Sequence, residues 1–341
     1  MQRIKSIEKM FFELMPYIEE PPVATDQLFK QACSSDEITV RTWKPTWIAN
    51  VKKNKEMFGS FADHSIGQLF GKFDKMPAII AGSGPSLNNN VEVLKKFKNN
   101  VPLISCLHNF HYMIDNEIKV NYFVTLDAGE VTIEEISEGG KLTHEEYIEK
   151  TKDFTLLAYI GTSPNLLNQW KGPVLFFNAP VPEKETADAI NEIENFGIFV
   201  SNGGNVLGAC MYIAKAILGC TPICFIGADF CFSYDNQFHP WKSKYDADLG
   251  NYMRWIDIWG NSVRTWTSYY NFKCWFDHMC HKLPGIWVNC SEDGILGSYI
   301  QGNIRAIKQM PLIKFLESYC LYEQLRVQIE NPTQDEKLLL F

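Results

Sequence analysis

Long apolar runs are missing from the sequence. The longest, residues 206–218, is interrupted by Gly208 and Lys215, well short of the roughly 20 apolar residues that a membrane-spanning helix needs. The opening residues, MQRIKSIEKMFFELM, also lack the apolar core and the cleavage site of a secretory signal. We therefore expect a cytoplasmic protein without a membrane span.

An excess of basic charge is missing as well. The chain has 32 Lys and Arg against 40 Asp and Glu, a formal net charge of -8. Nucleic-acid binding relies on clustered Lys and Arg that meet phosphates, so this balance argues against a nucleic-acid partner. Small phosphorylated ligands, such as a nucleotide or a nucleotide-sugar, remain compatible with it.

Paired cysteines are a third absence. None of the ten cysteines forms the CxxC pair of a structural zinc site, and their spacing follows no disulfide framework. Reduced thiols in the cytosol are the simplest interpretation.

The composition is that of a folded protein, with 46% hydrophobic and 21% charged residues. Between residues 76 and 300, short apolar runs alternate with turns and helical segments, for example in PAIIAGSGPSL, VPLISCLHNF and NYFVTLDAGE. Such alternation favours strands of a parallel sheet joined by helices. We predict an α/β fold with a Rossmann-like, mostly parallel sheet, helices on both faces, and additional helices at both ends of the chain.

Three regions follow from this pattern. Residues 1–75 are predicted as a small, mainly helical region, with helices at about 4–15 and 50–73 and an extended stretch up to Trp47. Residues 76–305 form the predicted nucleotide-binding catalytic domain. Residues 233–271, rich in Tyr, Trp, Asp and Asn, are predicted as an insertion or lid. Residues 306–341 are predicted as a C-terminal helix and tail.

A glycine-rich turn lies between the first strand and its helix. It consists of Gly82, Ser83, Gly84, Pro85 and Ser86, and it matches neither GxGxxG nor GxxxxGK[ST]. Glycines allow close backbone approach, and the unpaired N–H groups at a helix start attract anions. The turn is therefore a candidate phosphate site, although a purely structural turn is equally compatible with the spacing.

Two aspartates end predicted strands. Asp127 closes NYFVTLD and Asp229 closes PICFIGAD. Ligands of open parallel sheets gather at the carboxyl ends of strands, so both acids and the glycine turn are expected to face one crevice. Each acid could hold a ribose hydroxyl, bind Mg²⁺ or accept a proton, or it could cap a neighbouring helix.

Further polar turns complete the candidate site. His239 lies in the predicted lid as a candidate general acid or base, with a surface histidine as the alternative. The remaining candidate nucleotide-binding residues follow other strands or open other helices, where helix capping is the competing interpretation; they are Asn109, Asn202, Gly203, Gly204, Ser291 and Glu292.

Four segments of the chain carry a family resemblance. They are PAIIAGSGPSL, NYFVTLDAG, GGNVLGACMYIAKAILGCTPICFIGADF and VNCSEDGILG. In this order they resemble the domain shared by motility accessory factor (Maf) flagellin glycosyltransferases and archaeal 6-hydroxymethylpterin diphosphokinase-like proteins. The stretch with Trp47, Asn50 and Asn54 resembles the segment that precedes the turn in Maf-like proteins. AIIAGSGPSL and LGCTPICFIGADF are also similar to segments of bacterial CMP-sialic-acid sialyltransferases.

The resemblance implies a nucleotide ligand: CMP-nonulosonic acid in the glycosyltransferases, or ATP with Mg²⁺ in the pterin enzyme. It implies that the AGSGPSL turn contacts the nucleotide and that Asp229 matches a family Asp. Asp127 and Ser83 stand where the sialyltransferases have Asn, and Cys231 replaces an aromatic residue. The sialyltransferases' catalytic histidine has no aligned counterpart, which leaves His239 as a candidate only.

The sequence thus favours transfer of a sugar from a CMP donor to a hydroxyl of a protein or glycan acceptor. One alternative is an ATP-dependent diphosphotransferase in which Asp127 and Asp229 hold Mg²⁺. Another is a nucleotide-binding protein that has kept the fold without the chemistry.

Overall fold

The computed structural model describes residues 23–96, 101–181, 183–241, 252–297 and 307–320. The helix expected at residues 4–15 and the tail beyond residue 320 lie outside these ranges. No described helix combines the length and the apolar character that a membrane crossing requires.

An eight-stranded parallel sheet forms the core, in the order β10-β9-β6-β1-β2-β3-β4-β5. Most of its strands are buried along their whole length, as the short apolar runs predict for a sheet covered on both faces. The α/β, Rossmann-like fold class is confirmed. The strands are β1 (Ala78–Ala81), β2 (Leu103–Cys106), β3 (Tyr122–Thr125), β4 (Thr155–Tyr159), β5 (Val174–Phe177), β6 (Ile223–Ile226), β9 (Trp287–Asn289) and β10 (Ile307–Gln309).

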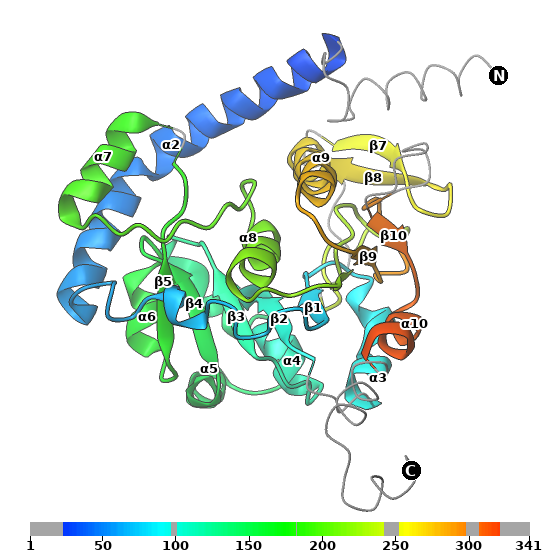
Figure 1. Ribbon diagram of the computed structural model, residues 1–341, viewed down its shortest axis with the longest axis horizontal. Coiled ribbons are helices and arrows are strands. Elements are labelled where there is room, and N and C mark those ends of the chain that lie inside the picture. The colour runs from blue at the N-terminus through cyan, green and yellow to red at the C-terminus, as the bar shows by residue number, and fades with distance from the viewer. Residues whose placement is uncertain (1–22, 97–100, 182, 242–251, 298–306, 321–341) are drawn as a thin grey trace, which may run out of the picture.

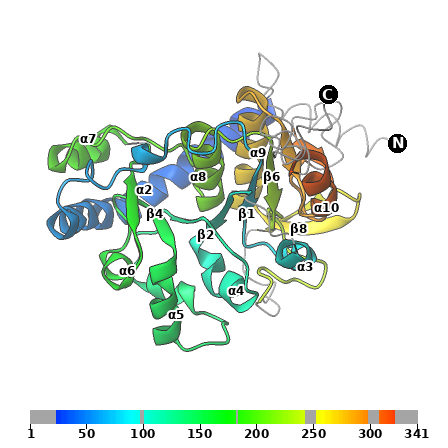
Figure 2. The same ribbon diagram turned by 60° about the horizontal axis from the view of Figure 1, so that its bottom comes forward.

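Helices cover both faces of the sheet (Figures 1 and 2). From β1 to β5 the chain advances in one direction, through α3 (Leu87–Lys96), α4 (Phe110–Asp115), α5 (His144–Lys150) and α6 (Pro164–Gln169) on one face. It then returns over the other face through α8 (Val206–Tyr212), extended by a π-helical turn at Ile213–Ile217, to place β6 beside β1. Right-handed crossovers demand this change of face when the direction reverses.

The N-terminal part differs from its prediction. A single helix, α2 (Val23–Phe58), runs through Pro45, where the prolines and threonines had predicted an extended stretch up to residue 47. Buried Val40 and Val51 anchor the helix to the body of the protein, so tertiary packing overrides the local signal. The helix expected at residues 50–73 ends at Phe58, before Gly59 with φ of 75°, and only a short 3-10 turn, Ile66–Leu69, follows.

The C-terminal half also holds unpredicted strands. Within residues 233–271, β7 (Tyr252–Ile256) and β8 (Ser262–Trp266) form an antiparallel hairpin, and α9 (Thr267–Lys282) follows it. The region expected to be helical after residue 305 begins with β10, a strand of three residues that needs β9 as its partner. Only then do α10 (Leu312–Phe315) and a π-helical turn, Leu316–Cys320, appear. The remaining helix, α7 (Lys184–Ile193), packs on α2.

Candidate functional site

The site lies where the strand order reverses. β1 and β6 are neighbours, with Ala81 paired to Ile226, but the chain leaves them toward opposite faces of the sheet. The loops after the two strands therefore open a crevice at the carboxyl edge, which is where open α/β sheets bind ligands. The glycine turn follows β1, and Asp229 follows β6.

Close contact between these two loops explains why residues 82 and 84 are glycines. A Cβ atom on Gly82 would lie 2.4 Å from the carbonyl oxygen of Gly227. One on Gly84 would lie 2.6 Å from Cγ of Asp229. Neither distance is sterically acceptable, so both positions need glycine for packing, independently of any ligand.

Most amides of the turn are already used, which corrects the expectation of a cluster of unpaired N–H groups. The N–H of Gly82 donates to the Ile226 carbonyl at 2.8 Å, and that of Gly84 to the Gly227 carbonyl at 2.9 Å. Ser86 N–H donates to Oδ2 of Asp229 at 2.8 Å. Among residues 82–86, all of them described, only the N–H of Ser83 remains available for an anion.

Asp229 joins the two loops. It is buried, and its carboxylate accepts hydrogen bonds from both the N–H and the hydroxyl of Ser86. Burial raises the pKa of Asp229 to about 7, against the lowering effect of the two Ser86 hydrogen bonds. The helix-capping interpretation therefore applies to Asp229, although the same residue also lines the cavity described next.

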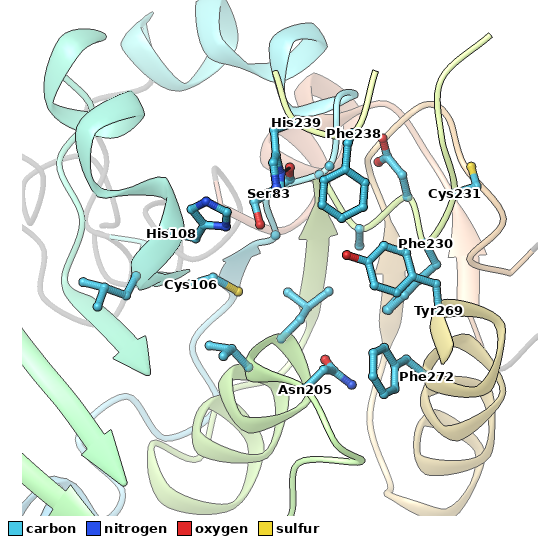
Figure 3. A pocket seen from close by; sticks show the side chains of 18 of the residues that line it. Ser83, Cys106, His108, Asn205, Phe230, Cys231, Phe238, His239, Tyr269 and Phe272 are labelled. Atoms are coloured by element: carbon cyan, nitrogen blue, oxygen red, sulfur yellow. Dashed lines mark hydrogen bonds between the residues drawn. The ribbon is translucent and has the colours of Figure 1, made fainter. Parts of the chain in front are cut away.

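A cavity of about 320 Å³ lies against these loops (Figure 3). Gly84, Asp127 and Asp229 all line it, so the three loops predicted to meet at one edge of the sheet do meet. Aromatic side chains from the opposite side complete the wall, and they are Phe230, Phe238, Tyr269 and Phe272. We refer to this space as the switch-point cavity.

His239 is a buried wall residue and not a surface histidine. Its Nδ1–H donates to the carbonyl oxygen of Ser83 at 2.7 Å. The imidazole stacks on Trp241, with ring centroids 4.8 Å apart and an interplanar angle of 6°, and it meets the edge of His108 at 4.5 Å. Figure 3 shows His239 beside Ser83 with His108 facing both. This packing fixes the histidine directly over the glycine turn.

Asp127 is held by its backbone and leaves its side chain open to the cavity. The Asp127 carbonyl accepts from the N–H of Ser163 at 3.0 Å. The next carbonyl, that of Ala128, accepts from Nδ2 of Asn50 at 3.0 Å. Surrounding protein raises the pKa of the Asp127 carboxyl by desolvation, against a hydrogen bond from Thr125 that lowers it.

A second and larger cavity adjoins the first. Its volume is about 790 Å³, and it shares three wall residues with the switch-point cavity: Asp127, Glu135 and Phe272. Three tryptophans contribute to its wall, Trp43 and Trp47 from α2 and Trp275 from α9. We refer to it as the tryptophan cavity.

The turn at residues 201–205 borders both cavities, and its residues predicted to bind the nucleotide border the tryptophan cavity. Asn202, Gly203 and Gly204 line the tryptophan cavity, while Asn205 lines the switch-point cavity. A Cβ atom on Gly203 would lie 2.2 Å from the Trp275 ring. This glycine is therefore needed for packing against α9, and it does not by itself indicate a nucleotide contact.

The other candidates from the sequence lie behind the walls and hold the loops. Nδ2 of Asn109 donates to the Gly82 carbonyl at 2.9 Å. Oγ of Ser291 accepts from the Ala228 N–H at 3.0 Å. Among the described walls, neither cavity includes these residues or the rest of this set, Pro85, Ser86 and Glu292.

Several wall residues were missed by sequence reasoning. Glu135 belongs to a 3-10 helix, Glu130–Ile136, whose solvated glutamates give no signal of a site. Trp43 lay in the stretch predicted as extended. Phe238 and Tyr269 fall within the predicted lid, but neither they nor Phe272 were singled out, because the approach of this segment and of α9 to the sheet is a long-range contact without a local sequence signature.

Few residues of the switch-point cavity could coordinate Mg²⁺. Both oxygens of Asp229 accept hydrogen bonds from Ser86, and the other carboxyl groups of the described wall are those of Asp127 and Glu135. Within the described ranges, no group of three or more His, Cys, Asp or Glu is arranged to hold a metal ion. The residues therefore do not fit a Mg²⁺ site made of protein ligands alone.

The charge of the walls is negative. Asp127, Glu135 and Asp229 contribute carboxyl groups, while no Lys or Arg belongs to the described lining of either cavity. Backbone dipoles and the histidines His108 and His239 are described groups of the switch-point wall that can stabilise a phosphate.

Comparisons with known proteins fit this architecture. A Maf glycosyltransferase from Magnetospirillum magneticum AMB-1 has a similar structure, with a TM-score of 0.51 at 19% sequence identity. The match covers 71% of this chain but 35% of that one, and at this identity it shows the fold alone. No curated protein matches the chain. A family model described as 6-hydroxymethylpterin diphosphokinase MptE-like matches residues 46–235, more than half of the sequence, and the chain belongs to this family.

Proposed function

We propose that the protein is a transferase that moves a sugar of the nonulosonic-acid type from a CMP-activated donor to a hydroxyl acceptor. The switch-point cavity takes the nucleotide end of the donor, and the tryptophan cavity takes the acceptor. Membership of the MptE-like family and the fold shared with a Maf glycosyltransferase support transferase chemistry in general. The donor and the acceptor class are the parts that we add.

One observation carries the choice of donor. The two cavities meet at Asp127 and Glu135, and their described walls hold no Lys or Arg. A nucleoside triphosphate concentrates several negative charges that must be neutralised by cations. A CMP-activated nonulosonic acid carries one phosphodiester and one sugar carboxylate, and its single phosphate can be stabilised by few donors, here the Ser83 N–H and His239. The walls therefore suit the phosphodiester better.

The positions of the residues support the following reaction. An acceptor oxygen in the tryptophan cavity attacks the anomeric carbon of the sugar and gives its proton to the carboxylate of Asp127, which lines both cavities at their junction. The bond between the anomeric carbon and the phosphate oxygen breaks, and CMP leaves with the electron pair. The Ser83 N–H and His239, which sits over the turn, stabilise the departing phosphate.

A second candidate function is an ATP-dependent diphosphotransferase, favoured by the description of the matching family. When bound, Mg²⁺ would neutralise the transferred phosphates, with Asp127 as a carboxylate ligand and the nucleotide supplying the others. A third candidate is a nucleotide-binding protein without turnover, because fold does not fix function.

Thermal-shift measurements with CMP, CDP, ATP and GTP, each with and without Mg²⁺, separate these candidates, since a ligand that binds only the folded state raises its stability. Cytidine nucleotides are expected to stabilise the protein without metal. Stabilisation by ATP only with Mg²⁺ would instead support the diphosphotransferase. If CMP binds but no donor turns over with any hydroxyl acceptor, the binding-protein candidate replaces the enzyme.

A further inference from the structure

The tryptophan cavity has the size and the wall chemistry of a ligand site. Its volume of about 790 Å³ lies within the range of small-molecule sites, about 300–1,000 Å³. The walls come from six separate parts of the chain: α2, the segment after β3, strand β4, the segment after β5, the turn at residues 201–204 and α9. Most of these parts are held by contacts already described, so the space is preformed.

The charge of the wall restricts which ligands the tryptophan cavity can bind. Asp127 and Glu135 lie at the junction, and no Lys or Arg balances them in the described lining. The switch-point cavity offsets these carboxyl groups with the Ser83 N–H and two histidines, His108 and His239, whereas the described lining of the tryptophan cavity holds no His, Lys or Arg. An anionic ligand there would meet like charge without such donors. A neutral ligand is therefore favoured over a phosphate, an acidic peptide or a nucleic acid.

The remaining wall groups combine flat apolar faces with short neutral polar groups. The indoles of Trp43, Trp47 and Trp275 alternate with amides and hydroxyls, among them Asn202 and Asn271. An amide side chain offers both donors and an acceptor, which matches a hydroxyl group that does both. A sugar ring presents an apolar C–H face and a rim of such hydroxyls, so it complements both kinds of wall.

One polar atom in this wall is unsatisfied. Tyr159 lines the cavity, and its buried hydroxyl has no hydrogen-bond partner among the residues that the structure describes. Leaving a buried hydroxyl unpaired costs free energy, and a ligand hydroxyl would remove that cost. This observation is independent of the tryptophans and points to a polar ligand.

We propose that the tryptophan cavity binds the end of a neutral glycan, which makes carbohydrate, and not polypeptide, the acceptor. The acceptor role rests on the proposed function, because the shared residue Asp127 would receive the proton of the sugar hydroxyl. Sugar binding itself requires no donor and no turnover, so it can be tested separately.

The test is a titration of the full-length protein with maltose, lactose, N-acetyllactosamine and methyl α-mannoside, followed by calorimetry and ligand-observed NMR. A neutral Ser- and Thr-containing peptide serves as the competing probe. At least one sugar is expected to saturate the protein with a Kd in about the millimolar range. Trp43→Ala, at a side chain that is 36% exposed, should weaken that binding about tenfold.

Two variants keep the test sharp. Trp259→Ala is the matched control, because Trp259 is 67% exposed and lies outside both described walls; it should bind sugar as the wild type does. Tyr159→Phe removes only the unpaired hydroxyl and should keep or raise the melting temperature while weakening sugar binding.

The proposal is overturned if no sugar saturates the protein, if the peptide binds in the sugar's place, or if neither Trp43→Ala nor Tyr159→Phe changes the affinity. A CMP titration of the same samples reports on the donor site. Sugar binding without CMP binding would reject the proposed function and retain the glycan site. CMP binding without sugar binding would do the reverse.

Discussion

At the scale of single residues, Gly84 and Asp229 are required for the contact between two loops, whether or not a ligand binds there. Gly84 has no side chain because Asp229 and the Gly227 carbonyl occupy that space. Asp229 is buried because it ties the start of α3 to the end of β6. The sequence alone marks both positions as candidates, but it cannot separate a loop contact from a phosphate contact.

Gly84→Ala is expected to destabilise the protein by about 1–3 kcal/mol, because the new methyl group overlaps backbone and carboxylate atoms that cannot move freely. Chemical denaturation measures the free energy of unfolding. Gly197→Ala is the matched control, since a Cβ atom at Gly197 would meet nothing within 4 Å. Equal effects of the two substitutions would contradict the packing account.

The raised pKa of Asp229 implies that the free energy of unfolding depends on pH. Its pKa is raised in the folded state to about 7 from its ordinary value of 3.8, so between these values the folded state holds a proton that the unfolded state has lost. The free energy of unfolding therefore falls as pH rises through this window, by at most about 1.4 kcal/mol per pH unit. Below this window Asp229 is protonated in both states and stability does not change with pH on its account. Above about pH 7 it is ionised in both states, and stability falls no further.

The substitution Asp229→Asn should remove this pH-dependent change in the free energy of unfolding. The wild type is expected to lose stability relative to the variant as pH rises from 5 to 8 by about that slope, levelling off above about 7. Melting curves across the pH range test this, with Asp63→Asn at an exposed residue as the control. Parallel pH profiles of wild type and Asp229→Asn would show that the carboxyl does not titrate as described.

At the scale of elements, the parallel strands other than β10 could be predicted from the sequence, because their apolar runs are local and most of them are soon followed by Gly, Asn or Asp. Helix α2, strand β10 and the β7–β8 hairpin could not, because each depends on distant partners. α2 shows the reason most clearly. Nδ2 of Asn54 donates to the carbonyls of Ile160 and Thr162, both at 2.8 Å, more than 100 residues along the chain.

Asn54→Ala should therefore cost about 2–4 kcal/mol, because it leaves two buried carbonyl groups without donors at the end of β4. Denaturant unfolding measures the loss. Lys52→Ala, at an exposed position of the same helix, should change stability by less than about 0.5 kcal/mol. A cost below 1 kcal/mol for Asn54→Ala would mean that other contacts hold α2 in place.

At the scale of the whole molecule, two cavities meet along the carboxyl edge of one sheet. The gathering of Gly84, Asp127 and Asp229 at this edge could be predicted, since it follows from parallel strand order. The tryptophan cavity could not, because its walls require α2 and α9 to approach each other across the same side of the sheet. The arrangement gives a place for a leaving nucleotide and, beside it, a place for an attacking hydroxyl.

The central claim is that the switch-point cavity binds a cytidine nucleotide without metal. Calorimetric titration of the full-length protein with CMP in the presence of a chelator tests it most directly, comparing wild type with His239→Ala and, as the matched control, His144→Ala outside both described walls. The account predicts saturable CMP binding that His239→Ala weakens about tenfold and His144→Ala leaves unchanged. Absence of CMP binding, or equal affinity in all three proteins, would contradict it.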